Sequence, residues 1–247
     1  AIPIGLQNLL VALIGATDVL MLGRLSQDAV AAVSLANQVA FIMNLFSGAV
    51  VGGGGVLIAQ YWGKNDKTKV KNLFCMLIKW AFGISTLFFI FAMFTPELLM
   101  QIYTPDTALI KIGASYLRSV SISYLFSGIT QCYYLIMKLE GKASKSVIIS
   151  IITLITDVVL DFFLIYGIAG VPKLEANGSA YSTVVVELIA LIWCIVESHR
   201  GESIHPDLQG VKWFSPDITK DLFKIALPML GSSLAWGLGF SMHSLIM

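Results

Sequence analysis

Long apolar segments alternate with short polar segments along most of the chain. A membrane-spanning helix needs about 20 mostly apolar residues. Segments that meet this requirement lie at 2–22, 31–61, 73–95, 113–137, 146–167 and 179–197, and a seventh begins near 225. Helices are expected rather than strands, because an open sheet cannot satisfy its backbone hydrogen bonds in lipid. The pattern predicts an all-α integral membrane protein, a bundle of six transmembrane helices followed by the start of a seventh.

The composition agrees with this class of protein. Hydrophobic residues make up 57% of the chain and charged residues 13%, and the mean hydropathy is +0.82. There is no basic tract with interleaved aromatic residues, so nucleic-acid binding is not expected. The cysteines all fall in apolar segments and are expected to be small buried side chains: Cys75, Cys132 and Cys194. Because the chain begins at Ala1 and ends inside an apolar run, we expect it to be a fragment, and no targeting signal can be judged.

Basic residues are concentrated in every second loop. The odd-numbered loops carry Arg24, Lys111 and Lys173. The even-numbered loops carry Lys64, Lys67, Lys69, Lys71, Lys138, Lys142, Lys145, Arg200, Lys212, Lys220 and Lys224. Under the positive-inside rule the even loops and the N-terminus are cytoplasmic, in a multi-pass protein of the plasma or bacterial inner membrane.

Four consecutive glycines interrupt the second apolar segment, in VVGGGG at 50–55. Neither a GK[ST] sequence nor a preceding strand is present, so a nucleotide site is not expected. Glycines in a membrane helix allow close helix packing or a local bend. Both interpretations remain open.

Carboxylates inside apolar segments are the most informative feature. Asp18 lies in the first segment, and Asp157 and Asp161 lie in the fifth. Charges at membrane depth cost several kcal/mol and mark ion or proton pathways. Asp157 and Asp161 are four residues apart, about 6 Å along one helix face, so one takes up a proton or a cation sits between them. The sequence assigns no role to a further acid, Glu187.

Other polar side chains at depth are expected to form hydrogen bonds between helices. They are Gln7, Asn8, Asn37, Gln38, Asn44, Gln131 and Thr183. Tyrosines of the fourth segment are expected to anchor at the interface or to stack on a cationic substrate. These are Tyr116, Tyr124, Tyr133 and Tyr134.

Four motifs resemble successive signatures of the multidrug and toxic compound extrusion (MATE) transporters. They are TDVLMLGRLSQDAVAAVSLANQ (17–38), LIAQYWGKND (57–66), ITDVVLDFFLIYG (155–167) and NGSAYSTVV (177–185). The resemblance runs along the whole chain and implies twelve helices in two six-helix lobes. It implies an N-terminal lobe at 1–197, a cytoplasmic linker at 198–224 and the first helix of the second lobe at 225–247.

The resemblance also implies roles for individual residues. Asp18 and Asp161 match acids of a cation-coupling site, and Asp157 stands where members commonly have Asn. Thr183 matches a hydroxyl ligand, Ser179 offers a backbone carbonyl, and Pro3 matches a proline at which the first helix bends. Na⁺ would bind at Asp18, Asp157, Asp161 and Thr183. Many bacterial members have an acid in the seventh helix where this chain has Ser233. The resemblance therefore favours a cation-coupling site in the N-terminal lobe over one in the second lobe.

The function implied is secondary antiport of organic, often cationic compounds against H⁺ or Na⁺, without a further cofactor and without enzymatic activity. The expected partners are a small organic substrate and the lipid bilayer, and the full-length protein is expected to be monomeric. One alternative is a lipid-linked glycan flippase of the same superfamily, for which a basic cavity is expected. Another is an intramembrane aspartyl protease, whose acids lie in YD and GxGD contexts rather than in the TDV and LDF found here.

Overall fold

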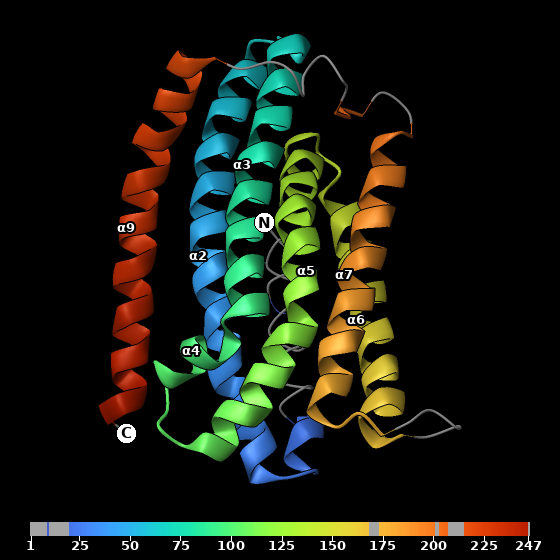
Figure 1. Ribbon diagram of the computed structural model, residues 1–247. Coiled ribbons are helices and arrows are strands. Elements are labelled where there is room, and N and C mark those ends of the chain that lie inside the picture. Colours follow the sequence, from blue (N-terminus) through green and yellow to red (C-terminus); the bar gives the residue numbers. More distant parts are fainter. Residues whose placement is uncertain (1–8, 10–19, 168–172, 201–202, 207–214, 247) are drawn as a thin grey trace.

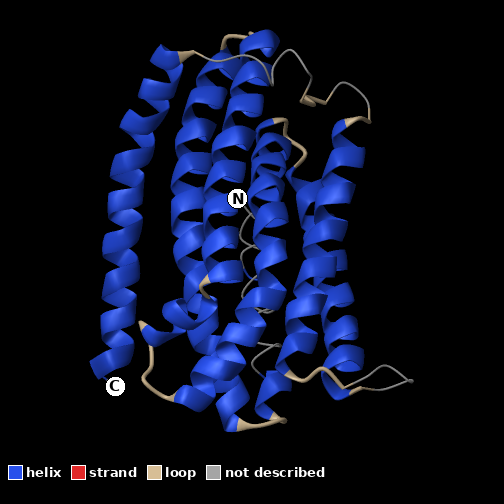
Figure 2. Ribbon diagram, in the orientation of Figure 1, coloured by secondary structure: helices blue, strands red, loops and turns tan. Residues whose placement is uncertain are grey.

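The computed structural model describes residues 9, 20–167, 173–200, 203–206 and 215–246, with the side chains of 238–246 left aside. Within these ranges the regular structure is all helix, joined by turns and short loops, and there is no strand (Figure 2). The long helices run up and down in alternation, so that consecutive helices are antiparallel (Figure 1). They are α2 (Gln27–Gly63), α3 (Lys67–Phe94), α5 (Thr107–Leu139), α6 (Ala143–Tyr166), α7 (Ala176–Ser198) and α9 (Pro216–Ile246).

Polar residues at the breaks define where these helices begin. Ser26, Asp66 and Asp106 each cap a helix by accepting a hydrogen bond from a backbone N–H in its first turn. This satisfies one of the N–H groups that a helix start leaves without a partner. The C-terminal end of α6 is marked by Gly167, which adopts a left-handed conformation with φ of 69° that glycine accepts without strain.

Five helices of the described part, α2, α3, α5, α6 and α7, are long and apolar enough to cross a membrane. They confirm the predicted second to sixth spans, and each begins three to six residues before the predicted start. In α3 this is because charged residues such as Lys67 and Lys71 are helical ahead of the apolar run. Most of the predicted first span lies outside the described residues. Helix α9 begins at Pro216, well before the predicted start near 225, and thus includes the charged stretch at 217–224.

One break between spans is more ordered than the sequence indicated. The segment after α3 was expected to be a loop, but Pro96–Gln101 forms a short helix, α4. Its proline stands at the start of the helix, where the missing N–H costs nothing. Gly113 of α5 allows close contact with α4, because a Cβ atom there would meet the Met100 side chain.

Helix α5 is the centre of the bundle. It packs against α2, α3, α4 and α7, while α6 lies beside α7 and α9 packs on α2. Apolar core residues form two clusters, one toward each end of the bundle. The first includes Phe74 and Cys194, and the second includes Met100 and Leu117. All three cysteines are buried free thiols, as predicted.

The glycine run confirms the close-packing interpretation. Helix α2 continues through it without interruption. A Cβ atom on Gly54 would lie 2.5 Å from a methyl group of Leu77 on α3, and one on Gly55 would lie 2.9 Å from Leu135 on α5. Glycine at these positions lets α2 approach its neighbours more closely than any side chain would permit.

Candidate functional site

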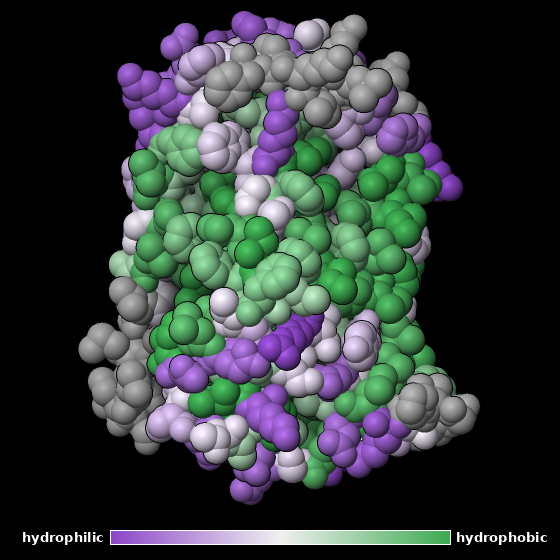
Figure 3. Space-filling model, in the orientation of Figure 1, coloured by the Kyte–Doolittle hydropathy of each residue, from purple (hydrophilic) through white to green (hydrophobic). Residues whose placement is uncertain are grey.

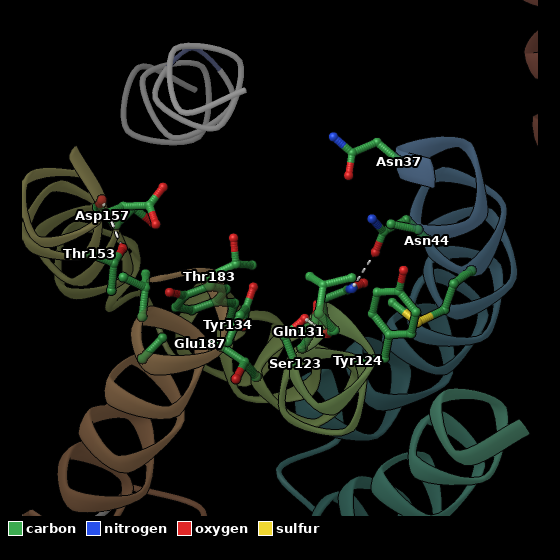
Figure 4. Close-up of a pocket in the computed structure, with 18 of the residues that line it drawn as sticks. Asn37, Asn44, Ser123, Tyr124, Gln131, Tyr134, Thr153, Asp157, Thr183 and Glu187 are labelled. Atoms are coloured by element: carbon green, nitrogen blue, oxygen red, sulfur yellow. Dashed lines mark hydrogen bonds between the residues drawn. The ribbon is translucent and has the colours of Figure 1, made fainter. Parts of the chain in front are cut away.

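A polar cavity of about 290 Å³ lies beside α5, between α2 on one side and α6 and α7 on the other (Figure 4). Its lining residues are near the middle of all four helices, and they include Met43 of the second apolar cluster and Ala190 of the first. Its polar lining includes Asn37, Asn44, Ser123, Tyr124, Ser127, Thr130, Gln131, Tyr134, Ser150, Thr153, Asp157, Thr183 and Glu187. The described lining contains two carboxylates and no Lys, Arg or His, so the cavity is acidic.

Hydrogen bonds between α2 and α5 form one wall of the cavity. Gln131 Nε2 donates to Asn44 Oδ1 at 3.1 Å, and the Tyr116 hydroxyl lies 3.3 Å from Asn37 Oδ1. These contacts confirm the predicted helix-to-helix role of Asn37, Asn44 and Gln131. They also hold amide groups at the cavity surface, where a ligand can meet them.

The tyrosines do not lie where interface anchoring would place them. Tyr116, Tyr124 and Tyr134 line the cavity, while Tyr133 packs edge-on against Phe74 with 5.2 Å between ring centroids. Anchoring was therefore the wrong expectation for this group. The central position of α5 in the bundle turns these residues inward.

Two acids lie close to one another between α6 and α7. Asp157 is 3% exposed and Asp161 is fully buried. Ser182 of α7 lies between them, with its Oγ 3.2 Å from Asp157 Oδ1 and in short contact with Asp161 Oδ1. The two helices come this close because of Gly178, where a Cβ atom would lie 2.7 Å from the backbone carbonyl carbon of Leu164.

The number of hydrogens at Ser182 limits the charge state of this cluster. Its hydroxyl also lies 3.0 Å from the carbonyl oxygen of Ser179, so three oxygens surround a group that carries a single hydrogen. The Ser182 hydroxyl can donate to one of these oxygens or share its hydrogen between two of them. A carboxylate contact that receives no hydrogen from Ser182 is favourable when that carboxyl group is protonated and donates to Oγ, or when a cation lies among the oxygens. The geometry thus suits uptake of a proton or a hard cation.

The predicted site residues on α7 adjoin this cluster. Thr183 lines the cavity, and its hydroxyl donates to the Ser179 carbonyl at 2.9 Å. Glu187, which the sequence left without a role, lines the cavity one turn further along. Ser233 lies on α9, away from the described lining. The predicted residues Asp18 and Pro3 lie outside the described residues.

Ser182 was missed by the sequence analysis. The family resemblance implies a role for its neighbour Thr183 but none for Ser182, and a small serine in an apolar helix is not by itself a sign of a site. The available signal was the spacing of Ser179 and Ser182, which places two hydroxyls on one helix face.

The fold and the cavity define a class of protein. Several apolar helices surround an acidic, polar cavity at half their length, which is the arrangement of one lobe of a multi-pass membrane transporter. Residues 3–163 match the family described as MatE. The chain belongs to the MatE family of transporters.

Relatives and solved structures agree with this membership. The chain is 25% identical over 236 residues to the uncharacterized transporter YisQ of Bacillus subtilis (strain 168), covering 96% of this chain and 52% of that protein. It is 26% identical over 238 residues to the probable multidrug resistance protein NorM of Rhizobium meliloti (strain 1021), covering 95% and 50%. It spans about half the length of these relatives.

Solved structures give the same fold. One described as the outward-facing conformation of a multidrug resistance MATE family transporter of the MOP superfamily aligns with a TM-score of 0.86 at 18% identity, covering 97% of this chain and 52% of that chain. Another, of MATE in the bent conformation, aligns with a TM-score of 0.87 at 17% identity, covering 97% and 53%. At these identities the likeness concerns the fold.

Proposed function

We propose that this chain forms the N-terminal lobe of a secondary antiporter that exports organic, often cationic compounds in exchange for H⁺ or Na⁺. The observation that carries the proposal is the pair of buried acids joined by Ser182 beside an acidic cavity. A relative described as a probable multidrug resistance protein supports the choice of organic compounds. The acidic lining favours a cationic substrate over the anionic headgroup of a lipid-linked glycan.

The chemistry follows from competition for the same negative charge. A proton or Na⁺ bound at Asp157 and Asp161 would lower the attraction of the cavity for a cationic substrate and so favour its release. Rocking of two lobes around a midplane cavity would then expose the site to alternate sides. Inward movement of one charge releases about 2.3 kcal/mol per 100 mV, which supplies a driving force for export.

The proposed orientation places the even-numbered loops in the cytoplasm. In the structure the α2–α3 turn, the α5–α6 turn and the end of α7 share the upper end in Figure 1. Their basic residues, including Lys64, Lys142 and Arg200, therefore lie at one end of the bundle. Single cysteines at Lys64 and Lys173 should react with an impermeant thiol reagent from opposite sides, since the native cysteines are buried. Labelling of both from the same side would overturn this orientation.

The function is tested with the full-length protein in proteoliposomes. Efflux of a cationic dye such as ethidium is followed while a pH gradient and a Na⁺ gradient are imposed separately. Asp161→Asn and Asp157→Asn are expected to abolish gradient-driven efflux, and Asp28→Asn, which removes an exposed acid from the first turn of α2, serves as the control. Efflux by Asp161→Asn at the wild-type rate would overturn the proposal. The gradient that drives dye movement identifies the coupling ion.

A further inference from the structure

A polar groove, separate from the central cavity, lies on the outside of the bundle at the end opposite the basic loops. It has a volume of about 630 Å³ and lies between α4, α5 and the start of α7. Figure 3 shows hydrophilic side chains over the lower part of this face, where α4 and α5 lie in Figure 1, beneath a broad hydrophobic surface. The groove takes no part in the central cavity.

One face of α5 supplies the basic side chains of the groove. Lys111, Ser115 and Arg118 follow at spacings of four and three residues, and all three are exposed. Arg118 Nη2 binds Glu97 Oε1 of α4 at 2.7 Å, with about half of each side chain exposed. Arginine has five N–H donors, so this single contact leaves most of them available. Two basic side chains face one acid, which leaves the groove positive.

The groove lies at the depth of the membrane boundary. Glu97 is in the first turn of α4, three residues after the end of α3, and Asn177 is in the first turn of α7. Asn177 Nδ2 donates to Ser115 Oγ at 2.9 Å, which places Ser115 at the level where α7 begins. About two turns further into the bundle, Ile122 and Val185 are 40% and 41% exposed. Polar groups at the boundary thus continue into apolar surface toward the membrane centre.

We propose that this groove binds one anionic phospholipid, with its phosphate at Lys111 and Arg118 and its acyl chains along Ile122 and Val185. A basic residue near the membrane surface contributes about 1 kcal/mol toward an anionic lipid. At the membrane boundary these basic side chains lie at the level of the lipid headgroups, where a phosphate can reach them. A headgroup in the groove would solvate both Arg118 and Lys111. Glu97 would hold the guanidinium in place while weakening the net attraction.

The test is native mass spectrometry of the full-length protein in detergent, with added phosphatidylglycerol or phosphatidylcholine. Phosphatidylglycerol is expected to bind at least fivefold more tightly. Lys111→Ala and Arg118→Ala should each weaken its binding about fivefold. Lys173→Ala, which removes a basic residue at the same end of the bundle but outside the groove, should leave binding unchanged.

Glu97→Gln gives the sharpest measurement, because removal of the competing carboxylate should strengthen phosphatidylglycerol binding. A folding defect would not produce a gain in affinity. Equal binding of the two lipids, unchanged binding by Lys111→Ala, or an equal loss in Lys173→Ala would each overturn the proposal. The measurement is independent of transport, so it stands apart from the proposed antiport.

Discussion

Gly53 on α2 lies directly against the backbone of Ala226 on α9, and a Cβ atom on the glycine would come within 3.1 Å of the Ala226 nitrogen. Both atoms at this contact belong to rigid helices, so neither can rotate away. Helix α9 packs on α2 over this stretch. The glycine run therefore sets the spacing between α2 and α9.

Gly53→Val is expected to destabilise the full-length protein by about 1–3 kcal/mol, because the added methyl groups overpack the α2–α9 contact. Gly48→Val is the matched control on the same helix, since a Cβ atom there meets nothing within 4 Å. Both variants carry the same change in helix propensity, so their difference isolates the clash. Thermal unfolding in detergent measures it, and equal melting temperatures would contradict the expectation.

Ser182→Ala tests the shared hydroxyl between Asp157 and Asp161. Loss of the hydroxyl leaves the buried carboxylates without their common partner, and coupled efflux is expected to fall about tenfold or more. Ser182→Thr should retain efflux because it keeps the hydroxyl. Thr156→Val is the control, since the Thr156 hydroxyl donates only to the Ile152 carbonyl of its own helix, at 2.8 Å. Dye efflux in proteoliposomes at fixed gradients provides the measurement, and wild-type efflux by Ser182→Ala would exclude a coupling role.

The sequence was sufficient for the number and type of the spans in the described part, because apolar length alone selects membrane helices. It also placed Asp157 and Asp161 on one face, since helical spacing is a local property. It could not place Ser182 beside them. That contact joins residues on two helices and depends on how closely α6 and α7 approach at Gly178.

The ends of the elements were harder to predict for a different physical reason. Hydropathy reports which residues prefer lipid, whereas a helix continues wherever its backbone hydrogen bonds continue. Charged residues at 67–71 and 217–224 are therefore helical although they are polar. The inward direction of Tyr124 and Tyr134 likewise followed from the central position of α5, which the order of spans did not reveal.

Tyr124→Phe separates a binding role from a structural role. The ring is 3% exposed and lines the cavity, and its hydroxyl has no hydrogen-bond partner among the described atoms. Removal of an unsatisfied buried hydroxyl should leave thermal stability unchanged or slightly higher. The affinity of the full-length protein for a substrate that carries a hydrogen-bond acceptor should fall about fivefold, the effect of one lost hydrogen bond of about 1 kcal/mol.

Tyr116→Phe is the matched comparison for this prediction, because it removes the hydroxyl that contacts Asn37 at 3.3 Å on the same cavity wall. This variant is expected to lose about 0.5–1.5 kcal/mol of stability. Unfolding curves and substrate titrations of the two variants provide the data. A clear loss of stability in Tyr124→Phe would show that its hydroxyl bonds within the protein and not with a ligand.

Glu140 holds the segment after α7 against the α5–α6 turn, and its removal should release that segment. Its carboxylate is almost fully buried, accepts a hydrogen bond from the backbone N–H of Ile204 at 2.6 Å and pairs with Lys142 Nζ at 2.7 Å. Lys142 also contacts the hydroxyl of Ser203.

Glu140→Ala would leave the Ile204 amide without its acceptor, a cost of about 1–3 kcal/mol. Hydrogen exchange at Ile204 is therefore expected to accelerate about tenfold or more in the full-length protein. Asp221→Ala, which breaks only an exposed pair with Lys224, should leave that exchange unchanged. Unchanged exchange in Glu140→Ala would mean that other contacts hold this segment, and efflux measured on the same variant would report whether its attachment matters for transport.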